Sequence, residues 1–199
     1  GLDKLNYLWY NVIMKNNTNM TKDEMKKAFV FDFDDTLATT CCMVRVVRKI
    51  DRKLNSEDGQ TKLPVEKLTP AEYNDHDLGF NCEYDFSEFR SKHFIRNANP
   101  TFLMALAQEV HDEGHSVFIL TARSDDVAAA IISFLAGFSV KPVGVHCVGS
   151  DTEKVDIAAE KGKVLKTIQE MHDVVYFYDD SKENCDLAKN VSGVKVYLV

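Results

Sequence analysis

The sequence predicts an α/β protein with a doubly wound, Rossmann-like parallel sheet and a small α+β insertion. Two observations support this class. The apolar runs at 28–33, 116–122 and 174–178 are continuous rather than alternating, which is typical of strands buried on both faces of a sheet. In the second half of the chain, such runs alternate with helical segments, which indicates a parallel sheet covered by helices on both sides.

The elements of the second half follow one another with clear boundaries. The segment 99–114 predicts a helix with Asn99 as the N-cap, Pro100 at the first helical position and Gly114 as the stop. Further helices are predicted at 124–137, 156–172 and 181–190, and strands at 116–122, 143–149, 174–180 and 194–199.

The first half is less regular. Apolar residues at helical spacing in 2–14 predict an N-terminal helical extension, which we place at 1–27. The stretch 38–97 is polar and weakly periodic, with turn clusters, and is predicted to be a small inserted α+β module. The core domain is therefore expected to consist of 28–37 and 98–199.

Composition and charge limit the classes of function. The chain has 45% hydrophobic residues and a formal net charge of −7, so its surface as a whole is not suited to nucleic acid, although a bound cation can invert the local field. Five cysteines without C-x-x-C spacing predict neither disulfides nor a zinc site, and we expect a reduced, cytoplasmic setting. No apolar run is long enough to span a membrane, so no membrane partner is expected. The histidines have no metal-ligand spacing and are expected to be surface or capping residues: His76, His93, His111, His115, His146 and His172.

Carboxylates collect where the predicted strands end. Asp32 and Asp34 follow the first strand, Thr121 ends the second apolar run, and Asp179 and Asp180 end the third. The carboxyl ends of parallel strands meet at one edge of the sheet, which is where ligands bind in such folds. Unpaired carboxylates at this density repel one another, and a divalent cation with oxygen ligands relieves the repulsion. Mg²⁺ suits this site because it takes few protein carboxylates and shares its remaining positions with water and phosphate oxygens.

Four motifs resemble those of the haloacid-dehalogenase-like hydrolase superfamily, and specifically its phosphatase branch with a small cap inserted after the first core strand. The first is D-x-D-x-T after an apolar strand, at 32–36. The second is Thr121 in "VFILTAR", the third is Lys161 near the start of a helix, and the fourth is the acidic pair that ends "VVYFYDD". They occur in order, with each strand in the expected context. The resemblance identifies 38–97 as the cap.

The resemblance implies a role for each motif residue. Asp32 is the nucleophile and forms an aspartyl-phosphate. Asp34 is the general acid for the leaving oxygen and then the base for the attacking water, so it must hold a proton near neutral pH. The hydroxyl of Thr121 and the amide of Ala122 bind phosphate oxygens, and Lys161 pairs with Asp32 and the phosphate.

The resemblance also implies a Mg²⁺ site. Its ligands are the carboxylate of Asp32, the main-chain carbonyl of Asp34 and the carboxylate of Asp180. Asp179 is expected to contribute through water or as a neighbour of the ligands. Many family members carry G-D-x-x-x-D here, and Asn184 departs from that pattern at the second Asp.

Several assignments stay open. Lys161 and Lys163 both lie near the start of the same predicted helix. Arg123 is equally suited to contact phosphate or a nearby carboxylate. Asp35 stands where glycine is frequent, and we prefer a role in shaping the turn over a direct catalytic one.

The insertion carries two features with competing interpretations. A basic cluster is preferred as a solvated strand edge over a surface that receives a polyanion; it comprises Arg45, Arg48, Lys49, Arg52 and Lys53. The aromatic residues Phe80, Tyr84 and Phe86 are preferred as packing residues over a platform for stacking a base.

The predicted function is a Mg²⁺-dependent phosphomonoesterase that acts through an aspartyl-phosphate intermediate. Its partner is a phosphorylated small molecule or a nucleic-acid end, and the candidate substrates are a nucleotide, a nucleic-acid 3' end or a small phosphorylated metabolite. The alternatives are a non-catalytic phosphate-binding module of the same fold and a phosphomutase. The sequence predicts neither the substrate nor the oligomeric state.

Overall fold

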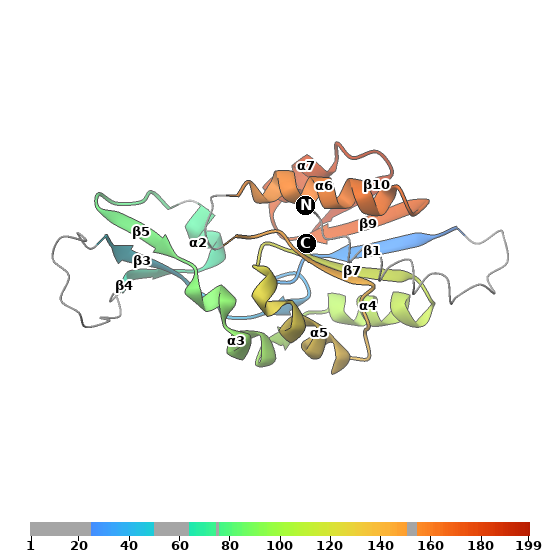
Figure 1. Ribbon diagram of the computed structural model, residues 1–199, viewed down its shortest axis with the longest axis horizontal. Coiled ribbons are helices and arrows are strands. Elements are labelled where there is room, and N and C mark those ends of the chain that lie inside the picture. Colours follow the sequence, from blue (N-terminus) through green and yellow to red (C-terminus); the bar gives the residue numbers. More distant parts are fainter. Residues whose placement is uncertain (1–24, 50–63, 75, 151–154) are drawn as a thin grey trace. The chain divides into compact units, whose positions relative to one another are not determined.

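The computed structural model describes residues 25–49, 64–74, 76–150 and 155–199 (Figure 1). The chain divides into two compact units. The core unit runs up to Thr39 and resumes at Asn99, and the second unit, here called the insert, is Thr40–Ala98. The helix predicted at 2–14 lies outside the described residues.

The described part of the core is built on a five-stranded sheet with the order β10, β9, β1, β7, β8. All neighbouring strands are parallel. The strands are β1 (Lys27–Phe31), β7 (Ser116–Thr121), β8 (Gly144–Cys147), β9 (Val174–Asp179) and β10 (Val194–Leu198). The predicted parallel α/β class is therefore confirmed, and β1 lies at the centre of the sheet.

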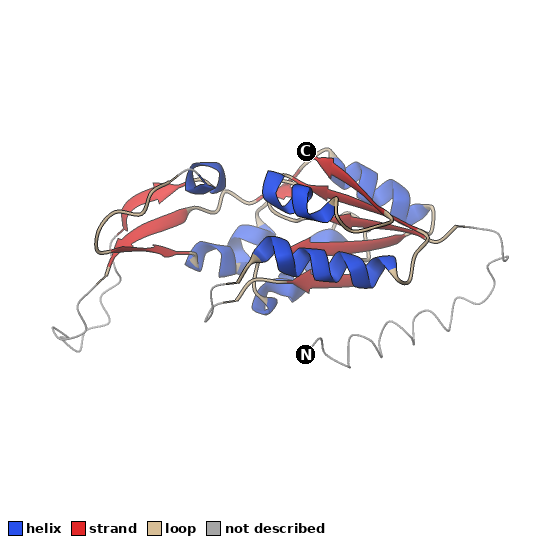
Figure 2. Cartoon of the chain, turned by 90° about the horizontal axis from the view of Figure 1, so that it is seen from above, coloured by secondary structure: helices blue, strands red, loops and turns tan. Residues whose placement is uncertain are grey.

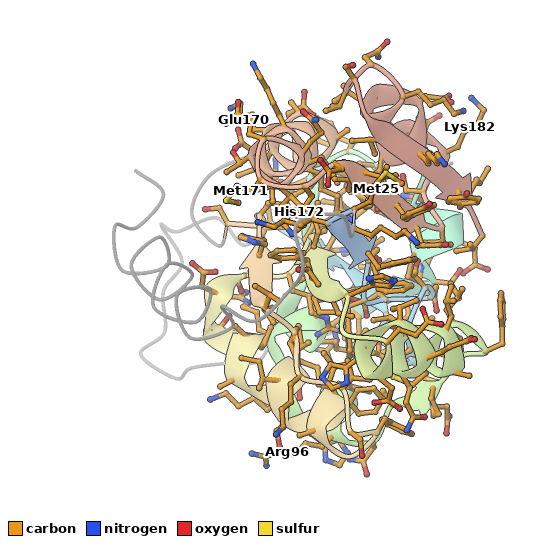
Figure 3. All side chains as sticks on the ribbon, turned by 90° about the vertical axis from the view of Figure 1, so that its right-hand side faces the viewer. Met25, Arg96, Glu170, Met171, His172 and Lys182 are labelled. Carbon is orange, nitrogen blue, oxygen red and sulfur yellow. The ribbon has the colours of Figure 1, made fainter. Side chains whose placement is uncertain are left out.

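Helices cover both faces of this sheet. In Figure 1, α6 (Ile157–Gln169) and α7 (Lys182–Ala188) lie on one face, and α4 (Leu103–Asp112) and α5 (Ala128–Ala136) lie on the other. Figure 3 shows the same layers from the end of the sheet at which β1 begins. A short 3-10 turn, η3 (Asp125–Val127), precedes α5.

Burial on both faces explains why β1 is apolar at successive positions. Ala28 and Val30 belong to a core cluster with Val164 and Leu165 of α6. The alternate residue Phe29 is also buried and stacks on Tyr176 and His115, whose ring centroids lie 4.7 and 5.5 Å away. A polar residue at any of these positions would lose its water without gaining a partner.

The helix predicted at 99–114 begins later than expected. Asn99–Pro100 forms a short strand, β6, that pairs antiparallel with β2 (Ala38–Thr39), and α4 starts at Leu103. Thr101 determines this start, because its hydroxyl accepts from Leu103 N at 3.2 Å while its own N–H donates to Leu37 O at 2.9 Å. The competing strand pairing thus outweighs the local cap signal of Asn-Pro. The predicted stop at Gly114 is confirmed by its φ of 84°.

The insert has its own small α+β fold (Figure 2, strands red and helices blue). A three-stranded antiparallel sheet has the order β4, β3, β5, formed by Pro64–Leu68, Val44–Arg48 and Cys82–Asp85. The helical segments are α2 (Pro70–Asn74), η2 (Ser87–Arg90) and α3 (Lys92–Arg96). Thr69 and Glu72 form a capping box at the start of α2, since Glu72 N donates to Thr69 Oγ1 at 3.2 Å and Thr69 N donates to Glu72 Oε2 at 2.8 Å.

Other predictions concern thiols, histidines and membrane spans. All five cysteines are free, as expected. Of the two positions expected for the histidines, His172 has the capping one, and it is buried at the end of the sheet seen in Figure 3. Its Nδ1 lies 2.8 Å from Ile168 O and its Nε2 lies 3.1 Å from Ser116 Oγ, so both ring nitrogens have partners that sequence spacing does not reveal. Across the described part of the chain, we find no helix with the length and apolar character needed to cross a membrane.

Candidate active site

The strand order brings three of the predicted site residues to one edge of the core sheet. β1 pairs with β7 on one side and with β9 on the other, with Phe31 opposite both Ile119 and Tyr178. Asp32 continues this register and donates its N–H to Tyr178 O at 2.9 Å. Thr121 is the last residue of β7 and Asp179 is the last residue of β9.

Lys161 lies between two of these carboxylates. It comes from the second turn of α6, whose N-cap Asp156 accepts from Ala159 N at 3.0 Å. Its Nζ donates to Asp32 Oδ1 and to Asp179 Oδ2, each at 2.7 Å. All three side chains are buried. The site therefore contains a buried ammonium with two anionic partners, an arrangement that retains one excess negative charge when both carboxyls are ionised.

The charges in this trio influence one another. Burial raises the pKa of the Asp32 carboxyl well above its usual range, and the positive charge of Lys161 only partly opposes this. Burial would by itself lower the pKa of Lys161, but the negative charges of Asp32 and Asp179 outweigh it and raise that pKa. Lys161 thus stays charged, and additional positive charge at the edge would favour an ionised Asp32.

Asp179 is oriented by two further donors. Ser181 N donates to its Oδ1 at 2.9 Å, and Asn184 Nδ2 lies 3.0 and 3.2 Å from its two oxygens. Ser181 is also the N-cap of α7, which places Asn184 in the first turn. The Asn that departs from the family pattern therefore acts here as a donor to Asp179. An Asp at this position would instead place a third carboxylate against the pair.

Asp34 pairs with Arg123, one of the two partners considered for that arginine. Arg123 Nε donates to Asp34 Oδ2 at 2.8 Å and Nη2 donates to Oδ1 at 2.7 Å, which is a two-pronged contact. The Arg123 side chain is only 1% exposed, and its guanidinium lies over the ring of Phe33 at 5.9 Å. Sequence order alone could not choose this partner, because the two residues are 89 positions apart.

The loop after β1 is a tight turn. Asp35 has a φ of 54°, in the left-handed region, and its N–H donates to Ala38 O at 2.9 Å. The interpretation of Asp35 as a residue that shapes the turn is therefore confirmed. Thr36 is buried beside it, and its hydroxyl has no hydrogen-bond partner among the described residues.

The loop after β7 is supported by a residue that sequence reasoning missed. Val148 N donates to Thr121 O at 2.9 Å, and Gly149 N donates to Arg123 O at 3.1 Å. A Cβ at position 149 would stand 2.0 Å from Ala122 O, so only glycine allows this approach. A glycine at the end of the predicted strand 143–149 was the available signal. The exposed Ala122 and the buried Thr121 are thus held in place by the two residues that follow β8.

The donor atoms available at this edge suit a hard cation. The described residues contain no group of three or more His, Cys, Asp or Glu side chains that could hold a metal. Mg²⁺ does not require one, because its sites typically use one or two carboxylates together with water and phosphate oxygens. Asp32, Asp180 and the carbonyl of Asp34 are oxygen donors at the ends of the adjacent strands β1 and β9. Partial desolvation, followed by the negative charge of Asp179, raises the pKa of Asp180 to about 6.

The remaining candidates lie elsewhere. Lys163 is on the surface, with a side chain that is 67% exposed and paired to Glu160 at 2.5 Å, so Lys161 is the lysine that meets the carboxylates. In the basic cluster of the insert, Arg45 pairs with Asp85 and Glu88, while Arg48 and Lys49 are exposed. Arg52 and Lys53 lie outside the described residues.

Comparisons with known proteins find a likeness to solved structures and not to characterised sequences. No family model matches the chain, and no curated protein matches its sequence. A chain of the Pnkp1/Rnl/Hen1 complex matches at a TM-score of 0.53 and 14% identity, over 92% of this chain and 50% of that chain. A second structure, of the Pnkp1/Rnl/Hen1 RNA repair complex, matches at a TM-score of 0.52 and 14% identity, over 92% and 46%. The chain thus spans about half the length of these two relatives.

A hydrolase of the haloacid dehalogenase-like family from Streptococcus pneumoniae also matches, at a TM-score of 0.47 and 15% identity, over 86% of this chain and 83% of that chain. The parallel strand order with β1 at its centre agrees with the architecture that the motifs led us to expect. The core of this chain therefore has a Rossmann-like α/β fold, with a five-stranded parallel sheet in its described part.

Proposed function

We propose that the chain is a Mg²⁺-dependent phosphomonoesterase that acts through an aspartyl-phosphate on Asp32. The observation that carries the proposal is the buried contact of Lys161 with Asp32 and Asp179, both at 2.7 Å, at the edge of the sheet that also presents Thr121. A lysine this deeply buried neutralises charge where it is needed, and phosphoryl transfer depends mainly on positioning and on charge neutralisation.

In the proposed first step, an Asp32 oxygen attacks phosphorus and forms the P–O bond of the aspartyl-phosphate. The bond from phosphorus to the leaving oxygen breaks, and Asp34 donates its proton to that oxygen. In the second step, Asp34 takes a proton from water, the hydroxyl attacks phosphorus, and the bond to Asp32 breaks to release inorganic phosphate. Each residue then returns to its starting state.

The residues around Asp32 would hold the phosphate. Lys161 would balance charge on the nucleophile and on the transferring group. The amide of Ala122 and the hydroxyl of Thr121 lie on the loop that Gly149 supports, and both are proposed to contact phosphate oxygens. The buried position of Lys161 favours it over Lys163 for this role.

Arg123 adds a condition to the proposed cycle. In its contact with Arg123, Asp34 is a paired carboxylate, and an ionised carboxylate cannot act as an acid. The paired state suits the base role in the second step. For the first step, Asp34 must loosen from Arg123 as it takes up a proton, so substrate binding is expected to weaken this contact.

Mg²⁺ would be held by Asp32, Asp180 and the carbonyl of Asp34, with Asp179 as a neighbour. When bound, it supplies positive charge that favours an ionised Asp32 and neutralises phosphate oxygens. The pKa of Asp180, near 6, implies that the ligand set is more completely ionised above that pH.

The substrate is proposed to be a phosphorylated small molecule or a nucleic-acid end. The two matching structures with TM-scores above 0.5 are both of the Pnkp1/Rnl/Hen1 assembly, which is an RNA repair complex. This supports a nucleic-acid end as a candidate. We further propose that 38–97 serves as a cap in the sense of the family and that the protein acts in the cytoplasm.

The test is hydrolysis of a generic aryl phosphate in the presence of Mg²⁺, comparing the wild type with Asp32→Asn. Asp112→Asn, a change at an exposed carboxylate of α4, serves as the matched control. We expect turnover in the wild type and the control, and loss of turnover in Asp32→Asn. Equal rates in all three proteins would refute the proposal. Transfer of phosphate to a sugar hydroxyl in preference to water would identify a phosphomutase.

A further inference from the structure

The insert presents a fully exposed aromatic ring. Phe80 is fully exposed, at 103%, whereas Tyr84 is partly buried and its hydroxyl donates to His76 O at 2.8 Å. Phe86 is intermediate between these two, since it is 41% exposed and contacts Tyr73 at a centroid distance of 5.3 Å. The structure therefore separates three aromatic residues that the sequence pattern grouped together.

The turn that carries Phe80 is ordered by its own hydrogen bonds. Cys82 N donates to Gly79 O at 3.2 Å, and Asn81 has a left-handed φ of 60°. Lys49 N donates to Asn81 O at 2.8 Å, which ties the turn to the end of β3. Phe80 is thus held out by a defined turn, which lowers the entropy lost when a ligand covers the ring.

Two exposed cations lie next to this turn. Arg48 is opposite Cys82 in the pairing of β3 with β5, and Lys49 is bonded to Asn81. Both are exposed, and no ion pair to another described residue is recorded for either. Arg45, three residues before Arg48 in β3, is by contrast neutralised by Asp85 and Glu88.

The distribution of charge also favours an anionic ligand at the insert. Residues 40–98 contain as many Lys and Arg as Asp and Glu, so the net charge of −7 belongs entirely to the rest of the chain. A polyanion is therefore repelled less by the insert than by the core. Nucleic-acid single strands are bound by this combination of an aromatic ring that stacks on a base and cations that contact phosphates.

We propose that Phe80, Arg48 and Lys49 form a binding surface for the single strand of a nucleic-acid substrate. This proposal rests on the proposed function, because the bound strand is a substrate only if the chain is a phosphomonoesterase that acts on nucleic-acid ends. Phe80 stacks on a base, and the two cations contact neighbouring phosphates. Because these contacts read no base edge, binding is expected to be tolerant of sequence.

The test is binding of fluorescent oligothymidylate and oligouridylate, each about 12 nucleotides long and without a terminal phosphate, to the full chain by fluorescence anisotropy. Phe80→Ala is expected to weaken binding by about 5- to 150-fold, the range that corresponds to the loss of one stacked base. Arg48→Gln with Lys49→Gln is expected to reduce the slope of log Kd against log salt by about 1.4, or 0.7 for each lost phosphate contact. Comparison of the two oligomers distinguishes DNA from RNA.

Matched controls are Phe102→Ala, at a phenylalanine of the core that is 78% exposed, and Lys92→Gln, at an exposed lysine of the insert. Both should bind as the wild type does. Phe80→Tyr should retain binding, because it retains the ring. Circular dichroism and thermal unfolding establish that each variant is folded.

Equal affinity of Phe80→Ala and the wild type would overturn the inference, as would absence of binding by the wild type. If Phe80→Ala lost binding to vesicles that contain anionic lipid but bound oligonucleotides as the wild type does, the surface would be a membrane-binding one. This result would also overturn the inference. Failure of the proposed function can be distinguished from failure of this inference. If the chain binds oligonucleotides but hydrolyses no aryl phosphate, the binding surface stands and the proposed enzyme activity is refuted.

Discussion

Replacement of Lys161 by methionine is the perturbation whose effect follows most directly from the structure. The side chain of Lys161 is 2% exposed and each of its two contacts is 2.7 Å long. Methionine fills a similar volume but leaves two buried carboxyl groups without their cation. Breaking a buried ion pair by removing one partner typically costs about 3–5 kcal/mol. We therefore expect the free energy of unfolding of Lys161→Met to be lower than that of the wild type by this amount at about pH 8, and we expect the variant to lose turnover.

The loss of unfolding free energy in Lys161→Met should be smaller at low pH. In the variant, burial without a counter-charge raises the pKa of Asp32 even further above the unfolded value of about 3.9. The folded state then holds a proton that the unfolded state releases. Because the folded state binds more protons, the unfolding free energy of the variant falls as pH rises from about 4 to the folded pKa. The stability difference from the wild type is therefore smaller at about pH 5 than at about pH 8.

Urea unfolding monitored by circular dichroism at both pH values measures this difference, in EDTA so that no cation replaces the ammonium. Lys163→Met is the matched control, since its side chain is 67% exposed and only two positions away. It should change the unfolding free energy by less than about 0.5 kcal/mol. If Lys161→Met costs no more than Lys163→Met, or if its cost is the same at both pH values, the reasoning about the buried trio is wrong.

Three further predictions follow. Asp34→Asn should slow hydrolysis of alkyl phosphates by about 10²–10⁴-fold and of activated aryl phosphates far less, because only a poor leaving group needs a proton; equal losses in a substrate comparison would remove Asp34 from the acid role. Gly149→Ala places a Cβ 2.0 Å from Ala122 O, so the Thr121 loop must shift, and kcat should fall by up to about 10²-fold; unchanged steady-state kinetics would contradict a positioning role for Gly149. Burial lowers the pKa of His172 below the unfolded value of about 6.5, so the unfolded state binds more protons and stability is lost as pH falls below that value, with a slope of at most about 1.4 kcal/mol per pH unit. Urea midpoints of His172→Gln between about pH 5 and 7.5 should fall less steeply than those of the wild type, and parallel curves would exclude this titration.

The regular elements of the core could be predicted because their signals are local. Continuous apolar runs indicate buried parallel strands, and the helix 156–172 contains α6 together with its N-cap, Asp156. The start of α4 could not be predicted in this way. Asn99–Pro100 has a good local helix signal, but it pairs with β2, which is about 60 residues away along the chain. Contacts across such a separation leave no trace in the spacing of neighbouring residues.

The residues of the candidate site also differ in whether local sequence signals could place them. Asp32, Thr121 and Asp179 could be placed together because each ends a strand, and the ends of parallel strands share an edge. The partner of Arg123 could not be inferred, since a guanidinium in that loop reaches several carboxylates and only the fold shows that it takes Asp34. Gly149 was missed because its role is to leave room for another segment.

The sequence by itself thus determined the class of fold, the order of the core elements and the residue types available for phosphoryl chemistry, because hydrophobic periodicity and strand ends are properties of contiguous residues. Only the tertiary structure decided that Lys161 rather than Lys163 meets the carboxylates, that Asn184 donates to Asp179, and that Phe80 faces solvent while Tyr84 packs. These outcomes depend on which face of a helix packs against the sheet and on which side chains from distant parts of the sequence contact it. Both are determined by the packing of the whole chain and not by neighbouring residues in the sequence.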